Sequence, residues 1–333
     1  MKKDYIGILV LICCVSLVPF FIQNNYYIGV FVFTGINCLA CIGLSLLMGY
    51  AGQISLGHAA FIGIGAYSSA ILTVTYHWFP WFAILAGVVF SVITALCIGI
   101  PALRLKGHYL AMATMGFGSI MHIVAVAAID ITAGPSGISG IPKLSLFGFE
   151  LNTDVQFFYF IWFVVILGLY LAINIIHSRE GRALRSLHGS EDAARAMGIH
   201  TSMYKIKIFL FSAVYASLAG SFYAHYVNYI DPDPFGVMHS VLLLTMVAVG
   251  GIHQLWGAVI GAILLSLLPE FLSSLTEFFD SFNITYQTDY DTIIYGSILL
   301  LIMLFMPEGL VKGISTFYKY TIGRYLIPKH ETK

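Results

Sequence analysis

The most polar stretch within the apolar part of the chain runs from residue 49 to residue 66. Its five glycines surround three side chains that can exchange hydrogen bonds with a polar solute, Gln53, Ser55 and His58. Glycine weakens helix continuity and lets backbones approach closely. Irregular backbone at membrane depth persists only where it is buried in protein or lines a water-filled cavity. Two interpretations are open: a broken helix lining a solute path, or tight helix packing around a satisfied buried histidine.

A weaker form of this pattern occurs at residues 250–262. A Gly-Gly pair, a histidine and a glutamine precede a helix that opens with Gly257 and Gly261, four residues apart. The pattern fits an internal repeat with two related half-helices. Simple helix packing is favoured over a repeat, because glycines at this spacing are common in membrane helices.

The sequence contains no recognisable catalytic or metal-binding pattern. A G-x-x-x-x-G-K-[ST] loop, an H-E-x-x-H motif and a Ser/His/Asp set are all absent. His58 has no second metal ligand at a useful spacing, and the five cysteines lie in apolar runs. We therefore expect no catalytic residue, no metal and no cofactor, and any ATP hydrolysis that drives the protein must occur on a separate chain.

The loop at residues 177–205 encodes a short helix. Ser190 is a good N-cap, acidic residues follow it, two alanines favour a helix, and a glycine stands at the C-cap position. The residues concerned are Glu191, Asp192, Ala193, Ala194 and Gly198. The pattern predicts a helix at about 191–197. It serves either as a solvated connector or as a docking element for a cytoplasmic partner.

The composition places these features in a membrane protein. Of the 333 residues, 59% are hydrophobic and 10% are charged, whereas a soluble protein carries about 25% charged residues. The mean hydropathy is +0.88. We expect an all-α polytopic membrane helical bundle, one transmembrane domain over 1–333 with glycine-broken segments. About ten spans are predicted, at 5–22, 27–50, 59–75, 79–100, 108–129, 155–176, 206–229, 237–250, 257–275 and 292–306.

The charges predict the orientation of these spans. With both termini in the cytoplasm, all of the 16 Lys and Arg residues except Lys143 fall at the inner side, including those of a basic tail at 307–333. The 16 acidic residues balance them, which argues against a nucleic-acid partner. The span cores are almost uncharged, although ion-coupled transporters usually keep charged residues there. This weighs against an ion-driven secondary transporter and favours a path for a neutral or zwitterionic solute.

Several longer stretches, taken in order, resemble one family. They are Leu47–Phe61 (LMGYAGQISLGHAAF), Pro101–Gly118 (PALRLKGHYLAMATMGFG), Gly134–Pro142 (GPSGISGIP), Gly181–His200, Gly250–Gly257 and Pro307–Leu310 (PEGL). Together they are similar to the permease subunits of branched-chain amino acid ABC importers, in the LivM-like branch.

The resemblance implies a membrane-lipid-embedded subunit of the bacterial inner membrane with no enzymatic activity. It implies three kinds of partner: a second permease subunit, two cytoplasmic ATPase subunits and an extracytoplasmic solute-binding protein. It also implies that Glu191, Ala193, Ala194 and Gly198 belong to the ATPase-coupling loop, with Asp192 as one residue more than the family pattern. The alternatives are a urea or short-chain amide importer permease, or a self-contained secondary transporter.

Overall fold

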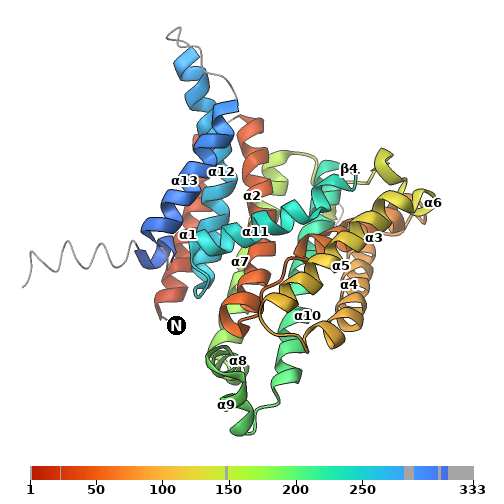
Figure 1. The fold of residues 1–333 in the computed structure, drawn as a ribbon. Helices are drawn as coiled ribbons and strands as arrows, with labels where there is room; N and C mark the ends of the chain where they lie inside the picture. The colour runs from red at the N-terminus through yellow and green to blue at the C-terminus, as the bar shows by residue number, and fades with distance from the viewer. Residues whose placement is uncertain (1, 23, 147–148, 281–288, 307–308, 314–333) are drawn as a thin grey trace, which may run out of the picture.

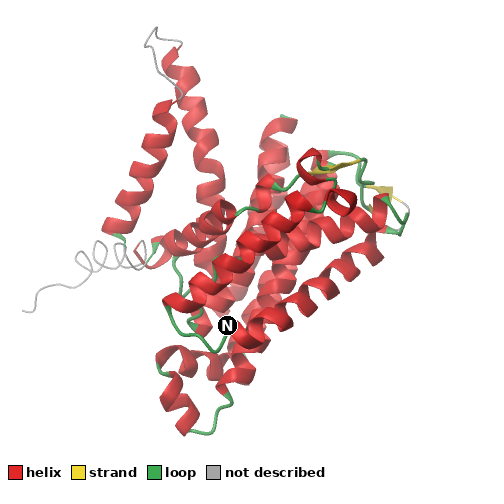
Figure 2. Cartoon of the chain, turned by 45° about the vertical axis from the view of Figure 1, so that its right-hand side comes forward, coloured by secondary structure: helices red, strands yellow, loops and turns green. Residues whose placement is uncertain are grey.

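The structure is a computed structural model and describes residues 2–22, 24–146, 149–280, 289–306 and 309–313. Nearly all of this is helical, and the strands form two short antiparallel pairs at one end (Figure 2). The fold class predicted from composition, an all-α polytopic bundle, is therefore confirmed. Of the predicted basic tail, only residues 309–313 lie among the described residues.

Each predicted span corresponds to a helix. They are α1 (Lys2–Phe21), α2 (Asn25–Ser45), α3 (His58–Val74), α4 (Pro80–Ala102), α5 (His108–Ala127), α7 (Asp154–His177), α10 (Thr201–Val227), α11 (Val237–Gly250), α12 (Leu255–Asp280) and α13 (Asp289–Phe305). Shorter elements connect them: the π-helix η1 (Leu46–Tyr50), α6 (Ile129–Thr132), α8 (Arg179–Gly189), α9 (Glu191–Ala196), and the 3-10 turns η2 (Gly134–Ser136) and η3 (Asp233–Phe235). The strands are β1 (Ile138–Ser139), β2 (Ser145–Leu146), β3 (Phe149–Glu150) and β4 (Tyr229–Ile230).

Among the described residues, seven helices are long and apolar enough to cross a membrane. The helices α3 and α11 are apolar but shorter, and α13 has 17 residues. A full crossing needs about 20 residues, so ten crossings stay a prediction. The short lengths of α3 and α11 agree with the glycine-rich ends that the sequence places beside them.

Local sequence explains where the helices begin. Asn24 caps α2 by accepting a hydrogen bond from the Tyr26 N–H, and Thr153 forms a capping box with Gln156 at the start of α7. Pro80 occupies the first turn of α4, where its missing N–H costs nothing.

The core lies around α2, α3 and α10. Most of α2 and α10 is buried, whereas α1 and α4 expose most of their apolar surface. At the crossing of α3 and α10, a Cβ on Gly65 would overlap the Ser217 carbonyl, and a Cβ on Gly220 would overlap the Ile62 carbonyl. The two backbones are therefore in direct contact, as is typical of small-residue crossings in membranes.

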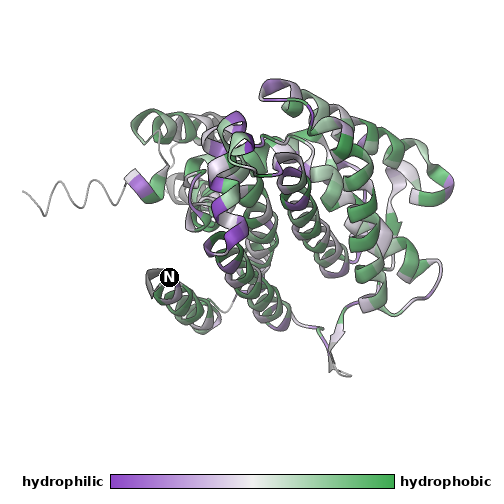
Figure 3. Ribbon diagram, turned by 90° about the horizontal axis from the view of Figure 1, so that it is seen from below, coloured by the Kyte–Doolittle hydropathy of each residue, from purple (hydrophilic) through white to green (hydrophobic). Residues whose placement is uncertain are grey.

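The segments predicted to be cytoplasmic gather at one end of the bundle, at the bottom of Figure 1. The α8–α9 pair lies there, Lys106 of the α4–α5 turn is 3.6 Å from Asp192, and Asp4 is 3.8 Å from His177 at the end of α7. Seen from below, hydrophobic helices surround more hydrophilic segments near the viewer (Figure 3). The opposite end holds the paired strands β1 and β4, with Ile138 opposite Ile230.

Candidate solute path and coupling surface

The chain between α2 and α3 is broken as the glycines predict. After η1, residues 52–57 are not helical, and Gly52 has a φ of +66°, which L side chains rarely adopt. Neighbouring helices satisfy the freed backbone groups. Thr114 of α5 accepts a hydrogen bond from the Leu56 N–H at 3.0 Å, and Ser240 of α11 accepts one from the Ala59 N–H at 2.9 Å. The break is thus buried inside the protein.

His58 sits in a continuous chain of hydrogen bonds at this break. Its Nδ1 lies 3.2 Å from Ser55 Oγ, and its Nε2 lies 2.5 Å from Ser212 Oγ on α10. Ser212 donates its own proton to the Gly43 carbonyl at 2.8 Å. Because the Ser212 proton is used in that bond, the His58 Nε2–H donates to Ser212 Oγ. Both interpretations of this segment therefore apply. The helix is broken, and both ring nitrogens of His58 beside the break have hydrogen-bond partners.

Gln53 differs from its two neighbours. Its side chain is only 3% exposed, and neither amide atom has a hydrogen-bond partner among the described residues. An unsatisfied buried polar group costs about 1–3 kcal/mol. Gln53 is therefore the member of the predicted trio with hydrogen-bonding capacity left for another molecule.

The second glycine-rich segment also breaks the chain, and it packs against the first. Residues 251–254 separate α11 from α12, and a Cβ on Gly49 would overlap the Ile252 carbonyl. Gly257 and Gly261 pack against the backbone of α11, as the packing interpretation expects. At the cytoplasmic end of this contact the rings of His188 and His253 lie 5.2 Å apart. Burial, and then the charge of His253, lowers the pKa of His188.

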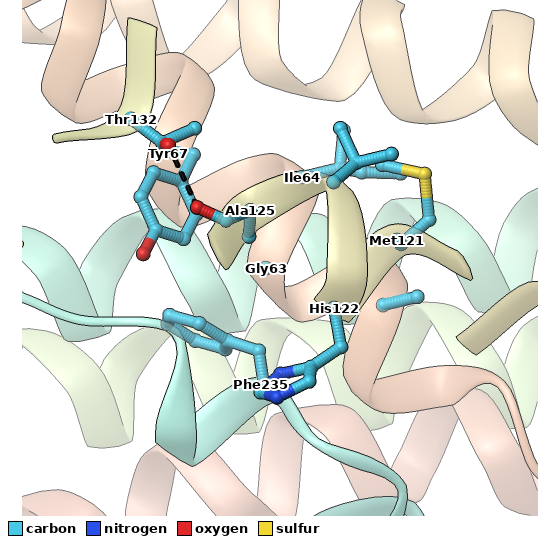
Figure 4. Close-up of a pocket in the computed structure, with 10 residues that line it drawn as sticks. Gly63, Ile64, Tyr67, Met121, His122, Ala125, Thr132 and Phe235 are labelled. Carbon is cyan, nitrogen blue, oxygen red and sulfur yellow. Dashed lines mark hydrogen bonds between the residues drawn. The ribbon is translucent and has the colours of Figure 1, made fainter. Parts of the chain in front are cut away.

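A partly open pocket of about 80 Å³ lies between α3, α5 and η3 (Figure 4). Its walls are almost wholly apolar. They include Gly63 and Tyr67 of α3, His122 of α5, and Phe235. The predicted trio Gln53, Ser55 and His58 is not part of this wall, although Ala60 of the same helix start is. Gln53 and Ser55 therefore precede α3, His58 begins it, and the cavity lies further along the same helix.

The predicted short helix in the loop 177–205 is confirmed as α9. Ser190 caps it by accepting a hydrogen bond from the Ala193 N–H at 3.3 Å, and Gly198 has a φ of +83° just beyond its end. Ala194 is buried against the protein, whereas Asp192, Ala193, Arg195, Ala196 and Met197 are exposed. The surface available to a partner is therefore centred on Asp192 and Met197.

Glu191 ties α9 to the transmembrane helices. Its carboxylate lies 2.6 Å from Lys205 Nζ at the start of α10, 3.2 Å from Arg195 and 4.0 Å from Lys106. Partial burial alone would raise the pKa of Glu191, but the hydrogen bond and charge of Lys205, with Lys106 and Arg195, lower it below its usual value. The contribution of this ionised group to stability is therefore present at neutral pH, and it is lost only as the pH falls through that lowered pKa.

A family model described as "Branched-chain amino acid transport system / permease component" matches residues 26–303. The chain belongs to this permease family. The match includes both glycine breaks, α9 and the α3–α10 crossing.

Curated relatives agree with the family. The permease protein LivM of a high-affinity branched-chain amino acid transport system in Salmonella typhimurium is 29% identical, over 88% of this chain and 71% of the relative. LivH from Escherichia coli is 26% identical over 82% and 90%. The Escherichia coli ribose import permease RbsC is 24% identical over 82% and 86%. No solved structure matches the chain. This permease is therefore a multi-pass membrane protein and a transport subunit of a partnered ABC importer.

Sequence reasoning missed three elements of the permease site. The sequence does not single out Ser212, which is the partner of His58. Lys205 and Lys106, which hold Glu191, were counted only as inner-side charges. The helix α8 was treated as loop, although its buried positions Gly181, Leu184 and Leu187 repeat every three residues and could have revealed one apolar helix face. Among the described residues, no group of three or more His, Cys, Asp or Glu could hold a metal ion.

The hydrogen-bond chain through His58 gives a first prediction. Ser212→Ala leaves the His58 Nε2–H without its partner in a buried site, which should cost about 1–3 kcal/mol of stability. Denaturant titration of the purified permease in detergent measures this loss. Ser16→Ala is the matched control, because Ser16 is exposed and its hydroxyl donates only to the Cys13 carbonyl of its own helix. Equal stability of the two variants would contradict the assignment.

Proposed function

We propose that this permease, together with a second permease chain, forms the inner-membrane pathway of an ATP-driven importer for branched-chain or related neutral amino acids. The observation that carries the proposal is the buried break at 52–57, whose polar side chains are uncharged. Gln53 there is 3% exposed and its amide is unpaired among the described residues. A neutral amide can exchange hydrogen bonds with a zwitterionic solute without trapping an ion in the bilayer.

The solute class rests on this polarity and on the relatives. The names of LivM and LivH refer to branched-chain amino acids, and that of RbsC refers to ribose, another uncharged polar solute. The apolar walls of the pocket further along α3, such as Tyr67 and Phe235, suit an aliphatic side chain better than a sugar. We therefore favour an amino acid with an apolar side chain.

Two ATPase subunits dock on the exposed surface of α9 and drive the movement of the pathway. Glu191 passes their movement to Lys205 on α10, and Ser212 of the same helix contacts His58 at the break. This is a connected route from the cytoplasmic surface to the polar segment. A solute-binding protein would deliver substrate at the opposite end, where the loop 130–154 lies.

The solute assignment is tested with the assembled importer in proteoliposomes. Labelled leucine should be taken up when ATP is supplied, and unlabelled isoleucine and valine should compete with it. Ribose, urea and acetamide should not compete at the same concentrations. Competition by ribose or urea, with no effect of valine, would assign a different solute class while leaving the family unchanged.

The role of Gln53 gives a second prediction. Gln53→Met keeps the volume and removes two unsatisfied buried polar atoms, so stability should stay the same or rise by about 1 kcal/mol. Leucine uptake should nevertheless fall about tenfold, which corresponds to the loss of about 1.4 kcal/mol of interaction with the moving solute. Uptake and denaturant stability are measured on the same preparation. Unchanged uptake with raised stability would remove Gln53 from the path.

A further inference from the structure

A pocket of about 370 Å³ opens at the cytoplasmic end of α4, away from the break and the glycine contacts. The end of α4, the α4–α5 turn, α9 and the start of α10 form its walls. The lining residues are Ile100, Leu103, Arg104, Lys106, Glu191, Arg195, Ser202 and Ile206. Apolar side chains of α4 and α10 thus form one part of the lining, and charged side chains of the α4–α5 turn and α9 form another.

The charged side carries an excess of positive charge. Arg104, Lys106 and Arg195 line the pocket with the carboxylate of Glu191. Just beyond it, Asp192 pairs with Lys106 and Lys205 pairs with Glu191. Glu191 is shared by three of these cations. Arg104 forms no ion pair with any described residue. Two positive charges therefore remain to be balanced, and an anion is the ligand that this part of the pocket would take.

The apolar side continues as a stripe along the exposed face of α4. Phe82, Leu85, Val89, Ile93 and Ile100 are each about half exposed or more, and their spacing of three, four, four and seven residues puts them on one helical face. The last of them, Ile100, is itself in the wall of the pocket. A long apolar chain can therefore lie along α4 while a group attached to its end occupies the charged pocket.

We propose that this pocket binds the headgroup of an anionic phospholipid from the cytoplasmic leaflet, with an acyl chain along the α4 stripe. Basic pockets between transmembrane helices on the cytoplasmic side favour anionic headgroups, and each basic residue near the surface adds to the attraction. The continuity of the pocket with the exposed stripe favours a lipid over a soluble anion. Because Arg195 and Lys106 are neighbours of Glu191, the lipid would also help to hold α9 against the membrane face.

The test is native mass spectrometry of the full chain titrated with dioleoylphosphatidylglycerol or dioleoylphosphatidylcholine. The unmodified chain should bind the anionic lipid about tenfold more tightly. Arg104→Gln/Lys106→Gln should bring its affinity down to that of the zwitterionic lipid. The matched control, Arg179→Gln/Arg182→Gln, makes the same charge change on exposed residues of α8 and should keep the preference. Ile100→Ser should weaken the binding of both lipids.

Three outcomes would overturn the proposal. The first is that the Arg104/Lys106 variant keeps its preference for the anionic lipid. The second is that the α8 control loses the preference to the same extent, which would show a general surface attraction. The third is that glycerol 3-phosphate, the soluble headgroup probe, competes as well as the lipid does. A thermal melt of each variant in the same detergent verifies that it is folded before it is compared.

Discussion

Gly220→Ala should destabilise the permease by about 3 kcal/mol, although alanine is the better helix former. A Cβ at position 220 would overlap the carbonyl of Ile62, a backbone atom that cannot rotate away. Relief requires α3 to move off α10. That movement would stretch the Ser69–His225 hydrogen bond of 2.7 Å and the His58–Ser212 contact, so one methyl group disturbs the whole crossing.

The matched control for this variant is Gly116→Ala on α5. A Cβ at position 116 has no atom within 4 Å, so this change should be neutral or slightly stabilising. The free energy of unfolding of both variants is measured by denaturant titration in detergent, and the folded fraction by size exclusion after heating. If the two alanines have the same effect, α3 and α10 are not in backbone contact.

Glu191→Gln should reduce ATP-dependent uptake about tenfold while leaving the transmembrane helices folded. The substitution removes the carboxylate shared by Lys205, Arg195 and Lys106. Lys205, which is only 7% exposed, would then lack its counter-charge. We expect α9 to detach from α10, because the ion pair is the main polar tie between them, and the movement of a docked ATPase would no longer reach the break.

Asp192→Asn is the matched control for Glu191→Gln. It makes the same charge change one residue further on, where the side chain is 80% exposed, and exposed ion pairs contribute little. Limited proteolysis of the loop 190–200 should show faster cleavage in the Glu191 variant alone. A double-mutant cycle with Lys205→Gln should give a coupling energy of about 1–3 kcal/mol. Additive effects would mean that the ion pair does not join α9 to α10.

The sequence predicted the features that depend on local pattern. Hydropathy located all ten apolar helices, and Ser190 with Gly198 bounded α9 to within one residue. The glycines around Gln53 predicted the break itself. In each case, a short run of residues is enough for the prediction. Apolar runs predict the membrane helices, capping residues predict the ends of α9, and glycines that tolerate a positive φ predict the break.

The parts that could not be predicted depend on how distant helices are rotated against one another. The partner of His58 is Ser212, 154 residues away, and nothing near either residue identifies it. Ser240, which satisfies the start of α3, lies 181 residues from its partner Ala59. Hydropathy gives the depth of such residues but not the direction in which they face. For the same reason, the sequence could not reveal that Ser55 and His58 are paired while Gln53 is not.

We propose that this permease moves its solute only when force is applied through α9. The measurement that tests it most directly is leucine uptake into proteoliposomes holding either the permease alone or the complete complex with its ATPase and second permease subunits. Each preparation is supplied with ATP or with a sodium or proton gradient. We expect uptake only by the complex, and only with ATP. Uptake by the permease alone, driven by an ion gradient, would contradict it.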